Sequence, residues 1–163
     1  MGDSSDDNLC IARVVPLPRP EAFALFTDGF GSWYPSIYTW SGDGLRFIGM
    51  EGRVGGHCFE VGPHDFRCDW GRVILWEPPE RIGFTWQISY SRAPVPDPVG
   101  CSEIEVVWSP RDDGSTDLEF CHRHFARHGE EWAAYREAMA SEGGWPYILG
   151  QYLTKAAGGV QPS

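Results

Sequence analysis

Alternation of apolar and polar residues over a long central stretch constrains the fold of this chain more than any other feature. Successive side chains of a β-strand point to opposite faces, so a period of two residues indicates strands with one buried face. The alternating segments are separated by turn-forming sequences, namely GDG, GPHD, EPPE and RDDGS. Short connections of this kind favour antiparallel neighbours. The predicted strands are residues 45–48, 56–61, 66–76, 81–90, 102–108 and 116–125.

The same alternation assigns side chains to the two faces of the sheet. Five apolar or aromatic residues of the segment 81–90 share one face, which we expect to be the core face. They are Ile82, Phe84, Trp86, Ile88 and Tyr90. In the segment 102–108, the acidic side chains fall on the opposite face, which we expect to be in water.

Two histidines interrupt the apolar face of the last predicted strand. His122 and His124 alternate with the same face as Leu118 and Phe120, near the end of the segment 116–125. An imidazole on an apolar face is a candidate for binding a ligand or transferring a proton near neutral pH. A histidine at a strand end also often bonds only a carbonyl or a water molecule. Both interpretations stay open at this point.

Helical periodicity lies on both sides of the alternating stretch. A short strand at 11–16 is followed by a short helix at 21–26 and a second helical turn at 30–34. Near the other end, residues 130–141 and 145–155 carry an apolar stripe at three- and four-residue spacings. An exposed stripe of Trp and Tyr is unfavourable, so we expect this C-terminal helix to cover the apolar face of the sheet.

Length and charge narrow the class of protein. The 163 residues fit one domain, which we place at 10–157, between a disordered N-terminus at 1–9 and a flexible tail at 158–163. A net charge of −10 argues against nucleic acids and anionic membranes as partners. No stretch approaches the roughly 18 apolar residues of a membrane span. The acidic start is unlike a signal peptide, so we expect a cytoplasmic protein.

The cysteines and histidines show no metal-site or disulfide spacing. The cysteines are odd in number and scattered: Cys10, Cys58, Cys68, Cys101 and Cys121. We therefore expect free thiols in a reducing compartment. The candidate zinc ligands His57, Cys58, His64 and Cys68 match no standard spacing, so we expect no metal. No phosphate loop or nucleophile motif occurs, and we expect no cofactor.

Five sequence blocks together resemble a known family. They are VPLPRPEAFALFTDGFGSWYP, RVGGHCFE, WGRVILWEPPERIGFTW, HRHF and GGWPYILGQYL, within residues 14–153. The chain resembles the heat-shock-protein-90 ATPase activator homologue-like branch of the START-like (SRPBCC) superfamily. The resemblance implies an α+β helix-grip fold, with a curved antiparallel sheet of about six to seven strands wrapped around a long C-terminal helix and two short helices after strand 1. His124 stands where the family pattern has a small residue.

The resemblance also implies a cavity between the sheet and the C-terminal helix. In relatives such a cavity binds lipids, polyketides, hormones or other apolar molecules. We therefore expect binding of a small apolar or aromatic molecule with one polar end, which would meet His122 or His124. The expected ligand-binding residues are Trp33, Phe59, Trp70, Arg72, Phe84, Trp86, Ile88, Trp108, Phe120, His122, His124, Trp145 and Tyr147.

Two other functions stay open beside passive binding. A cyclase- or isomerase-like enzyme would use His122 or His124 as general acid or base, with Arg72, Tyr90 or Tyr147 holding an oxyanion. A co-chaperone-like interaction domain is the other alternative, although the chain lacks the additional N-terminal domain expected of chaperone-binding members. Assembly into a homodimer is also left open.

Overall fold

The computed structural model of the protein describes residues 7–158. Seven antiparallel strands form one sheet in the order β1-β7-β6-β5-β4-β3-β2. The strands are β1 (Leu9–Val15), β2 (Phe47–Met50), β3 (His57–Val61), β4 (Arg67–Glu77), β5 (Arg81–Trp86), β6 (Ser102–Pro110) and β7 (Thr116–Arg123). The helices are α1 (Arg19–Thr27), α2 (Phe30–Trp33), α3 (Trp132–Ala140) and α4 (Trp145–Ala156). Short 3-10 turns include η2 (Ser36–Tyr38) and η6 (Phe125–His128).

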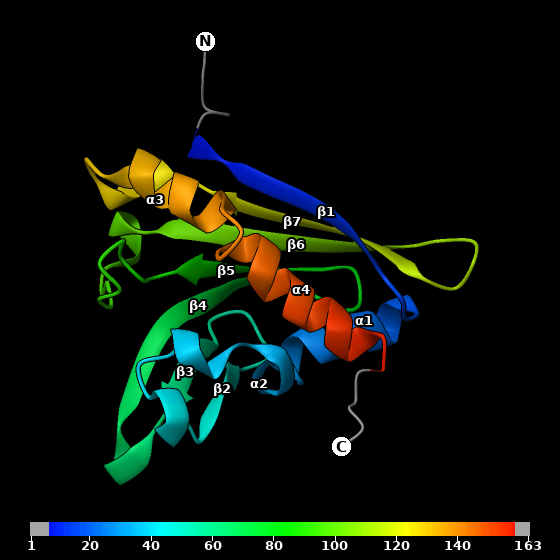
Figure 1. Cartoon of the computed structure of the whole chain (residues 1–163), viewed down its shortest axis with the longest axis horizontal. Helices are drawn as coiled ribbons and strands as arrows, with labels where there is room; N and C mark the ends of the chain where they lie inside the picture. The colour runs from blue at the N-terminus through cyan, green and yellow to red at the C-terminus, as the bar shows by residue number, and fades with distance from the viewer. Residues whose placement is uncertain (1–6, 159–163) are drawn as a thin grey trace.

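The helices gather on one face of the curved sheet. In Figure 1, α3 and α4 run one after the other across the sheet, and α1 and α2 lie beside α4. This arrangement confirms the α+β helix-grip fold, including the two short helices after the first strand. No helix in the described part of the chain is long and apolar enough to cross a membrane.

The apolar stripe of α4 anchors the C-terminal helix on the sheet. Tyr152 is fully buried, and its hydroxyl donates a hydrogen bond to the Ala22 carbonyl at 2.6 Å and accepts one from Trp108 Nε1 at 3.2 Å. One side chain thus joins α4 to α1 and to β6. The two helices are separated at Gly144, where a Cβ atom would collide with the Met139 carbonyl. A glycine is therefore required for the sharp turn between α3 and α4.

Two strands end earlier than the alternation predicts. β5 ends at Trp86 instead of continuing to residue 90, and Ile88 keeps a single isolated bridge to Pro94. β7 ends at Arg123, because His124 adopts a left-handed backbone with φ of 67° and Phe125 begins η6. The prediction that His124 continues the strand face of His122 is therefore wrong. The early end of β5 leaves a long loop before β6, and this loop forms part of the candidate site.

The prediction of five free thiols is also wrong. β1 pairs with β7 in a register that places Cys10 opposite Cys121, and these two residues form a disulfide. They are 111 residues apart in sequence. Their proximity depends on a pairing between the first and last strands that local alternation does not reveal. Cys58 and Cys68 are free thiols.

The predicted domain limits lie partly beyond the described residues. Residues 1–6 and 159–163 are outside them, so the expected disorder of these segments stays a prediction. Leu9 already belongs to β1, and the Asn8 carbonyl accepts a hydrogen bond from Arg136 Nε at 2.7 Å. β1 thus begins one residue before the expected limit, and the limits of the domain stay a prediction.

Candidate functional site

The main pocket of the structure lies between the loop after β5 and the junction of α3 with α4. Its volume is about 330 Å³, which is within the range of small-molecule sites. The loop and the end of β5 contribute Trp86, Ile88, Ser89, Tyr90 and Arg92. The helices and their junction contribute Tyr135, Ala138, Met139, Ser141, Gly143, Gly144 and Ile148. Tyr34 and Tyr38, after α2, complete the wall.

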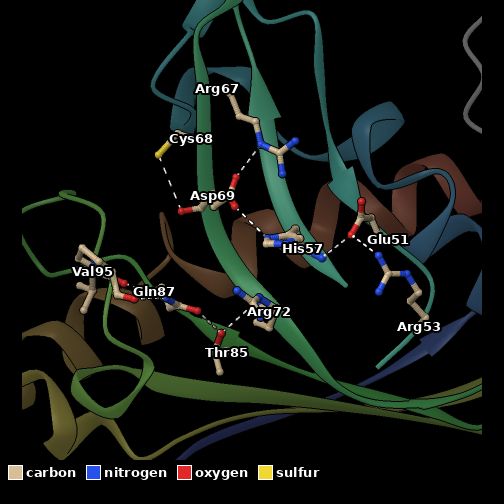
Figure 2. A network of polar contacts seen from close by, with 11 residues as sticks. Glu51, Arg53, His57, Arg67, Cys68, Asp69, Arg72, Thr85, Gln87 and Val95 are labelled. Carbon is tan, nitrogen blue, oxygen red and sulfur yellow. Dashed lines mark hydrogen bonds and ion pairs between the residues drawn. The ribbon is translucent and has the colours of Figure 1, made fainter. Parts of the chain in front are cut away.

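A chain of hydrogen bonds fixes the loop over the pocket (Figure 2). The Arg72 backbone N–H donates to Thr85 Oγ1 at 2.8 Å, and Thr85 Oγ1 donates to Gln87 Oε1 at 2.6 Å. The Gln87 amide nitrogen then donates to the Val95 carbonyl at 2.8 Å. Gln87 therefore joins the two sides of the loop and holds Arg92, at its tip, beside the pocket.

Aromatic side chains form a rigid wall on the helix side of the pocket. The Tyr135 hydroxyl accepts a hydrogen bond from Trp86 Nε1 at 2.8 Å and donates one to the Ile88 carbonyl at 2.7 Å. The Tyr90 ring lies against the Tyr135 ring, with 5.4 Å between the centroids. Because Trp86 Nε1 and the Tyr135 hydroxyl are both bonded within the protein, these two side chains offer mainly ring surface to a ligand.

Tyr34 and Arg92, which both line the pocket, have polar side-chain groups without hydrogen-bond partners among the described residues. Tyr34 is 9% exposed, and its hydroxyl forms no hydrogen bond within residues 7–158. Burial raises the pKa of Tyr34 well above its usual range, although Arg92 acts in the opposite direction, so the hydroxyl stays protonated. The Arg92 guanidinium forms no ion pair with the described residues and lies 5.1 Å from the centroid of the Tyr38 ring. These groups can bond oxygen atoms of a ligand.

A second, smaller cavity, the side pocket, adjoins the main pocket and has a volume of about 10 Å³. Four residues line both cavities: Tyr34, Tyr38, Trp86 and Ile88. The other residues of the side pocket are Thr39, Trp40, Ile48, Glu60 and Trp70. The Glu60 carboxylate is fully buried and accepts hydrogen bonds from the Trp40 N–H, the Ser41 N–H and the Ser41 hydroxyl at 3.2, 2.9 and 2.7 Å. Trp70 Nε1 is buried without an acceptor among the described residues.

The structure brings three of the expected ligand-binding residues to these cavities. Trp86 and Ile88 line both, and Trp70 lines the side pocket. Five others pack in the closed core, with exposures of 6% or less: Trp33, Phe84, Trp108, Phe120 and Trp145. These five side chains line neither cavity, and their contact with a ligand stays a prediction.

Three more expected residues lie away from both cavities. Phe59 faces the Arg67 guanidinium, 3.9 Å from its ring centroid, and Arg72 is exposed on β4. Tyr147 is 38% exposed, and its ring lies 5.9 Å from that of Tyr38, outside the pocket. Tyr90, expected as an oxyanion partner in the enzyme alternative, does line the main pocket.

His122 belongs to a sealed hydrogen-bond network instead of a pocket wall. Its Nδ1 accepts a hydrogen bond from Trp145 Nε1 at 2.9 Å, so the proton of the neutral ring is on Nε2. Nε2 donates to the Ser102 hydroxyl at 2.6 Å, which in turn donates to His128 Nε2 at 2.8 Å. The Phe125 ring stacks on the imidazole at 4.0 Å. His122 is 0% exposed and lines neither cavity.

Burial favours the neutral form of both network histidines. It lowers the pKa of His122 well below the usual value, and the nearby His128 acts in the same direction. Burial also lowers the pKa of His128. His124, the other histidine candidate, is half-buried at the start of η6, and its backbone N–H donates to Asn8 Oδ1 at 3.4 Å. Neither candidate base is positioned in the main pocket.

The polar cluster on β3 and β4 is an ion-pair network (Figure 2). His57 Nδ1 lies 2.9 Å from one Asp69 carboxylate oxygen, and Arg67 Nε donates to the other at 2.8 Å. Cys68 is adjacent, but its thiol approaches only the Asp69 carbonyl, at 3.9 Å. Across residues 7–158, no group of three or more His, Cys, Asp or Glu side chains is arranged to hold a metal ion.

Several residues of the site carry no clear signal in the sequence. Tyr34 marks only the end of a helical turn, Tyr38 falls in no periodic segment, and Tyr135 is one member of a helix stripe. Arg92 lies two residues after a segment whose alternation predicts a strand. The pair SR at 91–92, before the proline-rich PVPDP, was the available signal for a loop.

Comparison with known proteins identifies one family and several solved relatives. A family model described as "Activator of Hsp90 ATPase homolog 1-like protein" matches residues 16–158. An anthrahydroquino-γ-pyrone synthase, Txn09, solved in complex with SUM, is 27% identical, with 90% of this chain and 95% of that chain covered and a TM-score of 0.64. No curated protein matches the chain.

Two further structures share the fold at lower identity. CalC from Micromonospora echinospora, a self-sacrificing resistance protein, is 22% identical, with 96% of this chain and 99% of that chain covered and a TM-score of 0.64. Protein NE0264 from Nitrosomonas europaea is 18% identical, with the same shares covered and a TM-score of 0.66.

Proposed function

The chain belongs to the family of activator of Hsp90 ATPase homolog 1-like proteins, and we propose that its main pocket binds a small aromatic molecule with an oxygen-bearing polar end. The family match confirms the resemblance inferred from the sequence. The proposal keeps the ligand class expected from the sequence but changes the polar contacts. Tyr34 and Arg92 take the place of the two histidines, because neither histidine lines the pocket.

The observation that carries the proposal is a ring-lined pocket in which Tyr34 and Arg92 are unpaired polar groups. Trp86, Tyr90 and Tyr135 supply aromatic surface, on which a planar ligand can stack or pack edge to face. Tyr34 and Arg92 supply hydrogen-bond donors that no described residue satisfies. Small-molecule sites commonly combine a mainly apolar wall with a few placed polar groups.

One solved relative supports a ligand in this fold. Txn09, at 27% identity over 90% of this chain, is a synthase of an anthrahydroquino-γ-pyrone and was solved as a complex. The name of its product denotes fused aromatic rings and a pyrone ring, which contains oxygen. A ligand of similar shape and polarity suits the tyrosines and Arg92 of the main pocket.

The binding proposal is tested with anthraquinone-2-sulfonate, a planar three-ring compound with two neutral carbonyls and one sulfonate. Isothermal titration calorimetry compares the unmodified protein with Ala138→Trp, which places an indole in the pocket wall from an exposed position on α3. Ala133→Trp, exposed on the same helix but outside the pocket, is the matched control.

We expect binding to the unmodified protein and to Ala133→Trp with equal affinity. Ala138→Trp should bind about tenfold more weakly or not at all, a difference of about 1.4 kcal/mol or more. Absence of binding to the unmodified protein, or equal binding to Ala138→Trp, would contradict the main pocket as the site. Native mass spectrometry of the freshly purified protein then reports whether a compound of this class is retained.

Catalysis is a second candidate function, favoured by the synthase among the relatives. Tyr34 and Arg92 could stabilise a negatively charged oxygen in the pocket, as the enzyme alternative requires. A suitable probe is 1-(2-hydroxyphenyl)butane-1,3-dione, which closes to 2-methylchromone, a γ-pyrone, with loss of one water. Faster closure with the protein than in buffer, reduced in Tyr34→Phe, would support catalysis. An unchanged rate would leave binding as the function.

The partner alternatives remain predictions. A co-chaperone-like role and a homodimer were both left open from the sequence. Size-exclusion chromatography with light scattering tests the homodimer, and a pull-down with purified heat-shock protein 90 tests the chaperone contact.

A further inference from the structure

Two hydrogen-bond donors without acceptors are found in the wall of the side pocket. Trp70 lines it, is 2% exposed, and has a buried Nε1–H with no acceptor among the described residues. Tyr34 lines both cavities, is 9% exposed, and has a hydroxyl with no hydrogen bond in the same part of the chain. Buried polar groups are rarely left unpaired in folded proteins, so the buried Trp70 Nε1–H needs an explanation. The Tyr34 hydroxyl is an unpaired donor in the wall of the same cavity.

The chemistry of these two side chains determines the kind of group that can satisfy them. An indole N–H can only donate a hydrogen bond. The Tyr34 hydroxyl stays protonated, because burial raises its pKa, and it can therefore donate as well. The group that pairs with both must be a hydrogen-bond acceptor, which excludes an ammonium or amide N–H group.

The Glu60 carboxylate determines the charge of that acceptor. It lines the same side pocket and is fully buried, and its oxygens accept hydrogen bonds from Trp40 and Ser41. A carboxylate repels a second negative charge placed beside it. A neutral carbonyl oxygen is therefore favoured over a carboxylate or phosphate oxygen. The volume of about 10 Å³ is close to that of one water-sized group, which suits a single oxygen.

Arg92 indicates how the rest of the ligand is oriented. It lines the main pocket but not the side pocket, is exposed, and has no ion-pair partner within the described residues. An acidic or phenolic oxygen of the ligand is therefore favoured at the Arg92 end. The two cavities thus favour different ligand oxygens. The side pocket favours a neutral oxygen, and the main pocket favours an acidic one.

We infer that the side pocket is a carbonyl-recognition subsite, in which Trp70 Nε1 and the Tyr34 hydroxyl bond one neutral ketone or quinone oxygen of an aromatic ligand. This inference rests on the proposed function of the main pocket and narrows its ligand class to aryl ketones and quinones. The remaining rings lie in the main pocket, and an acidic substituent points toward Arg92.

The test compares two probes that differ in their carbonyl groups. Anthraquinone-2-sulfonate and anthracene-2-sulfonate have the same three-ring outline and the same charge, but only the first has carbonyls. Each is titrated calorimetrically into the unmodified protein, Tyr34→Phe and Trp70→Phe. Tyr147→Phe, which removes an exposed hydroxyl outside both cavities, is the control.

We expect the unmodified protein and Tyr147→Phe to prefer the quinone by about tenfold. In Tyr34→Phe this preference should fall by about three- to tenfold, while the affinity for anthracene-2-sulfonate stays the same. Trp70→Phe should have a similar effect. If Trp70→Phe does not fold, Tyr34→Phe and the infrared spectrum of the bound quinone still decide the question.

Infrared spectroscopy of the bound quinone provides a second readout. A hydrogen-bonded carbonyl has a lower stretching frequency than a free one, so one of the two carbonyl bands should shift down on binding and shift back partly in Tyr34→Phe. Equal affinity for the two probes, or a preference and spectrum unaffected by Tyr34→Phe, overturns the subsite while leaving the main pocket as a binding site. Failure of both probes to bind overturns the proposed function itself.

Discussion

Replacing Ser102 by alanine removes the hydroxyl that connects the two network histidines. That hydroxyl is fully buried, accepts from His122 Nε2 at 2.6 Å and donates to His128 Nε2 at 2.8 Å. In Ser102→Ala, the His122 N–H loses its acceptor in a region that is 0% exposed. His128 Nε2 keeps the hydrogen bond from the backbone N–H of residue 102, at 3.1 Å. The main consequence is one unsatisfied buried donor.

A buried donor left without its partner costs about 1–3 kcal/mol. We therefore expect Ser102→Ala to lower the free energy of unfolding by about 1–3 kcal/mol, measured by urea denaturation at pH 7.5 with circular dichroism. The matched control is Ser109→Ala on the same strand, where the hydroxyl is exposed and forms no hydrogen bond within the described residues. Its effect should stay within about 0.5 kcal/mol.

Ligand binding separates a structural role of this network from a functional one. His122 and Ser102 line neither cavity, so the affinity of Ser102→Ala for anthraquinone-2-sulfonate should stay within about twofold of the unmodified protein. The structural role would be refuted if Ser102→Ala left the free energy of unfolding unchanged within about 0.5 kcal/mol but weakened binding about tenfold. The network would then serve the ligand instead of the fold.

Three more predictions concern stability and pocket shape. Burial holds the pKa values of His122 and His128 in the folded state below that of the unfolded chain, about 6.5, so protons bind the unfolded chain preferentially. Stability should therefore be full above about pH 7 and fall as the pH drops through 6.5 and below; a urea midpoint that rises on acidification from pH 7 to pH 5 would contradict this. Tyr135→Phe leaves buried Trp86 Nε1 without an acceptor and should cost about 1–3 kcal/mol in urea unfolding, along with weaker probe binding in calorimetry; an unchanged midpoint would show that another acceptor replaces the hydroxyl. Gly144→Ala places a methyl group against the last turn of α3 and should lower the thermal midpoint, whereas Gly150→Ala, with open space at that position, should not.

The sheet and the C-terminal helices could be predicted because their signals are local. Alternation gives β4 and β6 within one or two residues of their observed ends, and the apolar stripe gives α4. The pairing of β1 with β7 is different, since it brings together the two ends of the fold. The disulfide between Cys10 and Cys121 depends on that pairing, and for this reason the sequence predicted free thiols instead.

The site was harder to predict than the fold, because it depends on where two strands stop. Alternation continues past Trp86 in the sequence, but the Gln87 side chain bonds Val95 and turns the chain into a loop. Alternation likewise continues to His124, whose backbone is left-handed. Periodicity identifies the face of a residue but not whether that face is covered by other side chains. The expected tryptophans therefore divide between pocket walls and closed core.

The unpaired donors of the pocket could not be identified from sequence at all. Tyr34 and Trp70 are ordinary core aromatics in their own segments, and only packing shows that their polar atoms lack partners. Glu60 is different, because its strand position alternates with the buried face although its side chain is acidic. A charged residue on the buried face of a strand was the available signal for a polar cavity.

A crystal structure of the protein with anthraquinone-2-sulfonate tests the binding site most directly. We expect the rings in the main pocket between Tyr90, Tyr135 and Trp86, with the sulfonate near Arg92 and one carbonyl oxygen within hydrogen-bond distance of Trp70 Nε1. Density for the compound elsewhere on the protein, with the main pocket closed by its own side chains, would contradict the assignment of this pocket as the ligand site.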